Sequence, residues 1–220
     1  FKMKGEKSMK DSNNIKTPDV IYGKAALLVI DFQNDFILSG APIECPGGQE
    51  AVKNTLPLIE KARSKKIPVI FTTEFHRDPK VFGPYDFGRE LDGEDPVHCV
   101  KDSDGYQLVD ELLPLAPTDY VLDKPRYSTF IGTDLDLILR SHKTETLIIT
   151  GVCTNICVHY NFIDAHQRDY RVRVVEECVA GTSLDAHNAA LKQINYLQYG
   201  GVQKLSSIMT AIDQIEDHFN

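Results

Sequence analysis

Three residues whose side chains suit nucleophilic catalysis lie at or just beyond the ends of predicted strands. Asp31 lies in IDFQNDF, Lys124 in LDKPRYSTF and Cys157 in TGVCTNICV. A free thiol has a pKa of ~8.5 and is mostly protonated at neutral pH. A nearby ammonium and a helix N-terminus both favour the thiolate, and a carboxylate within reach can accept the thiol proton. The three residues together predict a cysteine nucleophile with Asp31 as its base and Lys124 as its cationic partner.

Taken singly, each of these residues has an ordinary structural interpretation. An aspartate after a strand is often a cap or a surface residue, and a lysine at a strand end is usually solvated. A cysteine on an apolar helix face is usually a small buried hydrophobe. The catalytic hypothesis depends on Asp31, Lys124 and Cys157 meeting at one edge of the same sheet.

The turn Gly151-Val152-Cys153-Thr154 precedes the helix that carries Cys157. A turn at a helix start presents backbone N–H groups, and such donors stabilise the oxyanion that forms when a nucleophile attacks a carbonyl. This turn therefore predicts an oxyanion hole. Together with the three residues above, it completes a set of nucleophile, base and oxyanion hole that contains no histidine.

The elements that must position these residues alternate along the chain, because short apolar, β-branched runs are separated by segments of helical periodicity. Strict alternation implies right-handed crossovers and an α/β fold in which helices cover both faces of a parallel sheet. Active sites of such sheets lie beyond the carboxyl ends of the strands, where Asp31 and Lys124 fall. The predicted strands are 25–30, 67–73, 119–123, 144–150, 170–176 and 202–205, and the predicted helices are 49–66, 106–113, 134–141, 154–168, 185–199 and 207–219.

Length and composition limit the possible classes of protein. The length of 220 residues fits one domain, which we expect at 21–220 after a flexible tail at 1–20. The net charge of -8 provides no basic surface for nucleic acid, so we expect no nucleic-acid partner. No apolar run approaches the ~20 residues that span a bilayer, and the tail lacks the apolar region of a secretory signal. We therefore expect a cytoplasmic protein without a membrane partner. The five scattered cysteines are expected to be free thiols.

From residue 22 to 208 the chain resembles the isochorismatase-like cysteine hydrolases, which include nicotinamidases, N-carbamoylsarcosine amidases, ureidoacrylate amidohydrolases and biuret hydrolases. The strand ending in Asp31, the segment KPRYSTF and the segment TGVCTNICV carry the resemblance. The resemblance implies Asp31 as base, Lys124 as charged partner and Cys157 as nucleophile. It also implies a cis peptide between Val152 and Cys153, and an oxyanion hole formed by the N–H groups of Cys153 and Cys157.

The same resemblance implies a Rossmann-like, three-layer α/β/α fold whose six-stranded parallel sheet has the order 3-2-1-4-5-6. It also implies a homo-oligomer, either a dimer or a tetramer. We expect no cofactor.

A metal site is suggested by Glu74-Phe75-His76, which is similar to the Asp-x-His motif of nicotinamidases, although Lys80 stands where those enzymes have a second histidine. One carboxylate and one imidazole make a poor zinc site, so we expect no bound metal. His76 is instead a candidate for the entrance of the site, within a polar loop at 74–105 that acts as a lid or pocket wall. His98 either shapes the pocket or bonds to the loop backbone.

Six residues are candidates for the substrate pocket, although the aromatic ones could equally be core residues. Gln33 could reach a substrate amide, and Arg126 could pair with a substrate carboxylate. The candidates are Gln33, Phe36, His76, Arg126, Tyr127 and Phe130.

The sequence thus favours an enzyme that hydrolyses a small linear amide, ureido or carbamoyl compound and releases ammonia through a thioester. The segment KPRYSTF, which is similar to that of ureidoacrylate amidohydrolases, favours ureido or carboxylated amide substrates. The alternatives are a nicotinamidase- or pyrazinamidase-like hydrolysis of an aromatic carboxamide and a non-catalytic redox-sensing or binding protein.

Overall fold

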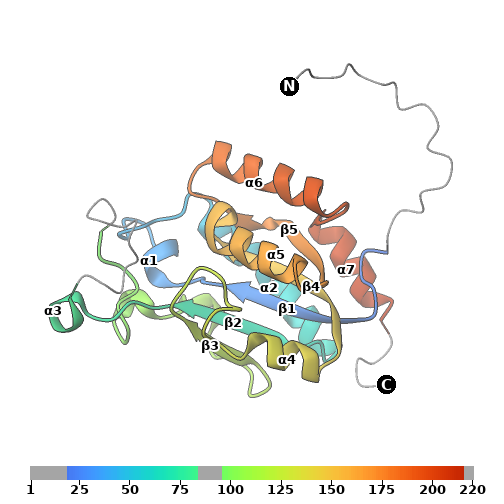
Figure 1. The fold of residues 1–220 in the computed structure, drawn as a ribbon, viewed down its shortest axis with the longest axis horizontal. Helices are drawn as coiled ribbons and strands as arrows, with labels where there is room; N and C mark the ends of the chain where they lie inside the picture. Colours follow the sequence, from blue (N-terminus) through green and yellow to red (C-terminus); the bar gives the residue numbers. More distant parts are fainter. Residues whose placement is uncertain (1–18, 84–95, 216–220) are drawn as a thin grey trace.

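The computed structural model describes residues 19–83 and 96–215, which form a six-stranded sheet with helices on both of its faces (Figure 1). All of the pairings between neighbouring strands are parallel, and the strand order is β3-β2-β1-β4-β5-β6. This architecture confirms the predicted fold class. The strands are β1 (Lys24–Ile30), β2 (Val69–Glu74), β3 (Tyr120–Lys124), β4 (Thr144–Val152), β5 (Arg171–Ala180) and β6 (Val202–Gln203).

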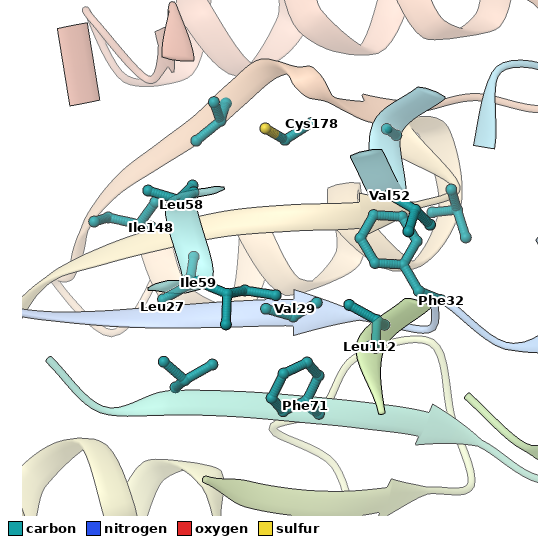
Figure 2. Packing of buried hydrophobic residues seen from close by; sticks show 14 of the residues in the cluster. Leu27, Val29, Phe32, Val52, Leu58, Ile59, Phe71, Leu112, Ile148 and Cys178 are labelled. Carbon is teal, nitrogen blue, oxygen red and sulfur yellow. The ribbon is translucent and has the colours of Figure 1, made fainter. Parts of the chain in front are cut away.

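Two hydrophobic clusters lie on opposite faces of the sheet. The first packs α2 (Gly48–Ser64) and α7 (Leu205–Asp213) against one face, and the second packs α4 (Leu135–Ser141), α5 (His159–His166) and α6 (Leu184–Leu197) against the other. Figure 2 shows part of the first cluster, in which labelled side chains of β1, β2 and β4 lie with those of α2.

The central strand β1 shows why the strands of this chain are continuous apolar runs. Leu27 and Val29 belong to the first cluster, whereas Leu28 and Ile30 belong to the second. Because successive side chains of a strand point to opposite faces, a strand that is covered on both sides must be apolar at every position.

The segment predicted as a helix at 106–113 is not one. It contains two short 3-10 turns, Asp104–Tyr106 and Asp110–Leu112. Between them the backbone bonds to the chain that follows β1: Asn34 N–H donates to Gln107 O at 2.9 Å, and Val109 N–H donates to Phe32 O at 3.0 Å. These tertiary hydrogen bonds replace the ones that a helix would make within itself.

Other boundaries differ more modestly from the predictions. The predicted helix at 154–168 begins as a π-helical turn, Thr154–Val158, before α5. Two short helices, α1 (Asn34–Ile37) and α3 (Pro79–Phe82), were not predicted. None of the helices in the described part of the chain is long and apolar enough to cross a membrane.

Most of the predicted tail lies outside the described residues, but its last two positions are anchored. Arg173 of β5 donates from Nε to Val20 O at 2.7 Å and from Nη2 to Asp19 O at 3.1 Å. Asp19 and Val20 thus bond to the sheet, while the division into a tail at 1–20 and a domain at 21–220 stays a prediction.

Gly151 lets β4 pass closely by the end of β1. Its φ is +124°, and a Cβ at this position would lie 2.1 Å from Ile30 O. We expect Gly151→Ala to lower the free energy of unfolding by roughly 3 kcal/mol, because it adds overpacking to backbone strain. Urea unfolding followed by circular dichroism measures this change.

Gly40→Ala is the matched control, since Gly40 also has a positive φ (+78°) but nothing within 4 Å of the added Cβ. It should cost about 1 kcal/mol from backbone strain alone. Equal losses in the two variants would show that the close approach to Ile30 has no energetic weight.

Candidate active site

The structure brings Asp31, Lys124 and Cys157 together at the carboxyl edge of the sheet. Lys124 Nζ lies 2.7 Å from Asp31 Oδ2 and 3.5 Å from Cys157 Sγ, and all three side chains are buried. Asp31 directly follows β1, Lys124 ends β3, and Cys157 lies in the π-helical turn after β4. The long stem of Lys124 spans the gap, since β2 lies between β3 and β1.

Thr72 of β2 fixes the orientation of the Asp31 carboxylate. The Thr72 hydroxyl donates to Asp31 Oδ1 at 2.6 Å and accepts from the Asp31 N–H at 3.2 Å. Asp31 itself has a φ of +53°, a conformation that aspartate adopts more readily than most residues. The first residue after β1 is thereby turned so that its side chain faces Lys124.

The charge balance of the site determines its protonation. Burial alone would lower the pKa of Lys124, but the charges of Asp31, Cys157 and Glu74 outweigh burial and raise it. Burial raises the pKa of Asp31, and Lys124 opposes that rise only in part. Lys124 therefore keeps its proton, and the carboxylic acid form of Asp31 becomes more accessible than in water.

The expectation that the surroundings of Cys157 favour its thiolate is wrong for the site without a substrate. Burial raises the pKa of Cys157 well above that of a free thiol, and the carboxylates of Glu74 and Asp31 raise it further, whereas Lys124 lowers it. One ammonium cannot offset burial together with two neighbouring carboxylates.

Glu74 also lies beside Cys157, whereas the sequence analysis considered it only as part of a metal motif. Its Oε2 accepts from the Cys157 thiol at 3.6 Å and lies 3.8 Å from Lys124 Nζ, and its side chain is buried. Glu74 ends β2 in register with Lys124 of β3. Its position at a strand end, as for Asp31 and Lys124, is the signal that could have found it.

Gln33 binds the backbone of Glu74. The fully buried Gln33 amide accepts from Glu74 N–H and donates to Glu74 O, both at 2.8 Å, and it also donates to Tyr106 O at 2.8 Å. These bonds use both N–H donors and the oxygen of its side chain, and its role as a pocket residue stays a prediction.

Two further pocket candidates are placed away from the nucleophile. The exposed Arg126 guanidinium donates to Pro125 O at 2.6 Å, and only its backbone carbonyl meets the site, accepting from Lys124 Nζ at 3.2 Å. Phe130 packs against Tyr170 and Arg168, which follow the end of α5 that is remote from Cys157.

The remaining candidates lie nearer the site. Phe36 is a buried core residue in edge contact with His98, at 5.9 Å between ring centroids. Tyr127 packs against Tyr160 of α5, at 5.3 Å between centroids. His76 is buried, with Nε2 3.7 Å from Glu74 Oε1. Of these three, His76 is the one that contacts Glu74, the neighbour of Cys157.

The peptide between Val152 and Cys153 is cis. Cys153 O accepts from the N–H groups of Ile156 and Val158, at 2.9 and 3.2 Å, as the π-helical turn begins. On the far side of that turn, Thr154 Oγ1 lies 2.8 Å from His187 Nδ1. His187 therefore has a structural contact with the turn that carries Cys157.

A candidate metal site adjoins Cys157. Ligand atoms of Glu74, His76 and His98 lie within 4.8 Å of one another, and all three residues are buried. His98, whose Nδ1 bonds to Pro96 O at 2.8 Å, adds the second imidazole that the sequence analysis did not count. Two imidazoles and a carboxylate are a common donor set for zinc, so these residues fit a divalent ion.

We expect Gln33→Leu to lower the free energy of unfolding by about 2–4 kcal/mol, because it leaves buried backbone groups of Glu74 and Tyr106 without partners. Asn34→Ala is the control, since the Asn34 amide makes an exposed bond to Asp104 O. Its effect should stay below about 1 kcal/mol. Urea unfolding of both variants measures the difference, and similar losses would contradict the positioning role of Gln33.

Comparisons of the sequence and the fold with known proteins all find members of one family. The Isochorismatase domain model matches residues 25–210. A probable inactive nicotinamidase of Arabidopsis thaliana is 36% identical over 169 residues, covering 74% of this chain and 84% of the relative. A ureidoacrylate amidohydrolase of Enterobacter is 32% identical over 210 residues, covering 86% and 89%. The pyrazinamidase of Pyrococcus horikoshii in complex with zinc superposes with a TM-score of 0.71 at 27% identity, covering 82% and 98%.

Proposed function

Because this chain belongs to the isochorismatase family and is an amidohydrolase acting on carbon–nitrogen bonds other than peptide bonds, we propose that it hydrolyses a small linear ureido, carbamoyl or amide compound with Cys157 as the nucleophile. The observation that carries this proposal is the buried cluster in which Lys124 Nζ lies 2.7 Å from Asp31 and 3.5 Å from Cys157. A charged cluster of this kind is costly to bury, and it places the proposed base Asp31 within 4.8 Å of the proposed nucleophile.

In the proposed mechanism, Asp31 accepts the Cys157 proton as the sulfur attacks the substrate carbonyl. The proton transfer accompanies the attack, because the raised pKa of Cys157 keeps the thiol protonated until then. Backbone N–H groups of Cys153 and Cys157 stabilise the oxyanion. Protonated Asp31 then gives its proton to the leaving nitrogen, and ammonia departs. Asp31 next activates a water molecule that hydrolyses the S-acyl intermediate and restores the thiol.

Two observations support a ureido substrate. The Enterobacter relative, which aligns over 86% of this chain, is named for ureidoacrylate. The site also presents a second carboxylate, Glu74, beside the sulfur, and carboxylates accept hydrogen bonds from N–H groups.

A second candidate function is hydrolysis of an aromatic carboxamide. The cluster of Glu74, His76 and His98 favours it, because the similar pyrazinamidase of Pyrococcus horikoshii was crystallised with zinc. An ion held by these three residues would polarise a carbonyl oxygen or lower the pKa of a bound water.

The oligomeric state and the cytoplasmic location of this chain stay predictions.

The test is an ammonia-release screen over ureido compounds, carbamoyl amino acids, linear amides and nicotinamide. We expect turnover of a ureido or carbamoyl compound and a loss of roughly 10⁴-fold or more in kcat in Cys157→Ala, because the nucleophile is removed. Cys178→Ala is the matched control, since Cys178 is also a buried thiol but lies in the other hydrophobic cluster. It should keep wild-type turnover.

Two results would contradict the proposal. Wild-type turnover in Cys157→Ala would exclude the cysteine mechanism. Turnover of nicotinamide but of no ureido or carbamoyl compound would favour the aromatic carboxamide.

A further inference from the structure

Building on the proposed function, we propose that Glu74 accepts an N–H from the second nitrogen of a ureido substrate. The site would thereby select ureido groups over simple carboxamides. This role assigns Glu74 a direct contact with substrate, in addition to its contact with Cys157.

Besides Lys124, which lies 3.5 Å from Cys157 Sγ, three kinds of polar group are available to a substrate carbon that is bonded to this sulfur. The first is the set of backbone N–H groups of Cys153 and Cys157 proposed for the oxyanion. The second is Asp31, which has a carboxylate oxygen within 4.8 Å of the sulfur. The third is Glu74, whose Oε2 lies 3.6 Å from the sulfur itself. The site thus offers N–H donors for one atom of the substrate, and the carboxylates of Asp31 and Glu74 for two other atoms of the substrate.

A ureido carbon matches this arrangement because it bears one oxygen and two nitrogens. The oxygen suits the N–H donors, the leaving nitrogen suits Asp31, and the second nitrogen carries an N–H that suits Glu74. A simple carboxamide has one nitrogen, so its attached carbon would face Glu74 instead. A buried carboxylate that meets a CH₂ group gains no hydrogen bond, and removing it from water carries a cost.

The backbone of Glu74, from which the carboxylate extends, is fixed before any substrate arrives. Gln33 bonds to both the N–H and the carbonyl of Glu74 at 2.8 Å, and β-sheet register pairs Glu74 with Lys124. A group held in this way loses little conformational entropy when it binds a ligand.

Charge compensation of Lys124 does not by itself account for Glu74. Asp31 is already the direct partner of Lys124 at 2.7 Å, whereas Glu74 Oε2 is 3.8 Å away. The two oxygens of Glu74 also face different neighbours, because Oε1 lies 3.7 Å from His76 Nε2. The proposed contact uses only the oxygen that faces the sulfur.

The test compares two probes that differ by one group, N-carbamoylglycine, which has an N–H beside the carbonyl, and succinamate, which has a CH₂ there. Wild-type enzyme should prefer N-carbamoylglycine in kcat/KM. Glu74→Leu should lower kcat/KM for N-carbamoylglycine roughly 10- to 100-fold more than for succinamate, the loss expected for a hydrogen bond to a charged group. Glu50→Gln, an exposed carboxylate on α2, should leave the ratio unchanged.

A binding measurement separates recognition from catalysis. In a Cys157→Ala background, calorimetry in EDTA should show that Glu74→Leu weakens binding of N-carbamoylglycine more than that of succinamate. Should Glu74→Leu fail to fold, Glu74→Gln should shift the ratio in the same direction by at least about threefold, since a neutral acceptor is weaker. An equal loss for both probes, or a preference that disappears in EDTA, overturns the inference.

These outcomes distinguish the inference from the function on which it rests. Cysteine-dependent release of ammonia from N-carbamoylglycine, with equal losses for both probes in the Glu74 variants, would overturn only the role of Glu74. Release of ammonia that survives Cys157→Ala, or from no ureido compound at all, would overturn the proposed function and the inference together.

Discussion

One ammonium group faces three acidic groups in this site, and that imbalance governs the chemistry. Lys124 Nζ lies within 4 Å of Asp31, Cys157 and Glu74, and all four side chains are buried. Away from water, three anions cannot be held by one cation without a large cost. Protons must therefore be retained by part of the set, and burial is the leading reason that the pKa values of Asp31 and Cys157 both rise. Under the proposed mechanism, the sulfur loses its proton only as a substrate takes up the charge.

The strand order is what delivers these groups to one place. The neighbouring strands β3, β2, β1 and β4 supply, in that order, Lys124, the pair Thr72 and Glu74, Asp31, and the turn that carries Cys157. Because side chains two apart on a strand share a face, Thr72 can hold Asp31 while Glu74 reaches Cys157. A single edge of the parallel sheet thus forms both the proposed base, Asp31, and its surroundings.

The features that the sequence predicted are those that depend on local pattern. Continuous apolar runs indicated strands buried on both faces, and strand-end positions brought Asp31, Lys124 and Cys157 to one edge. The features that it missed depend on tertiary contacts. Glu74 reaches the sulfur through its register with Lys124, and the predicted helix at 106–113 gives way to hydrogen bonds with the chain after β1. The direction of the Cys157 pKa shift requires a count of buried charges, which no motif contains.

Arg173 fixes the point at which the described part of the chain enters the fold. Its guanidinium holds the carbonyls of Asp19 and Val20 near the beginning of β5, whereas Asp31, Lys124 and Cys157 gather where strands finish. The first described residues therefore lie at the edge of the sheet opposite the one at which these three side chains meet.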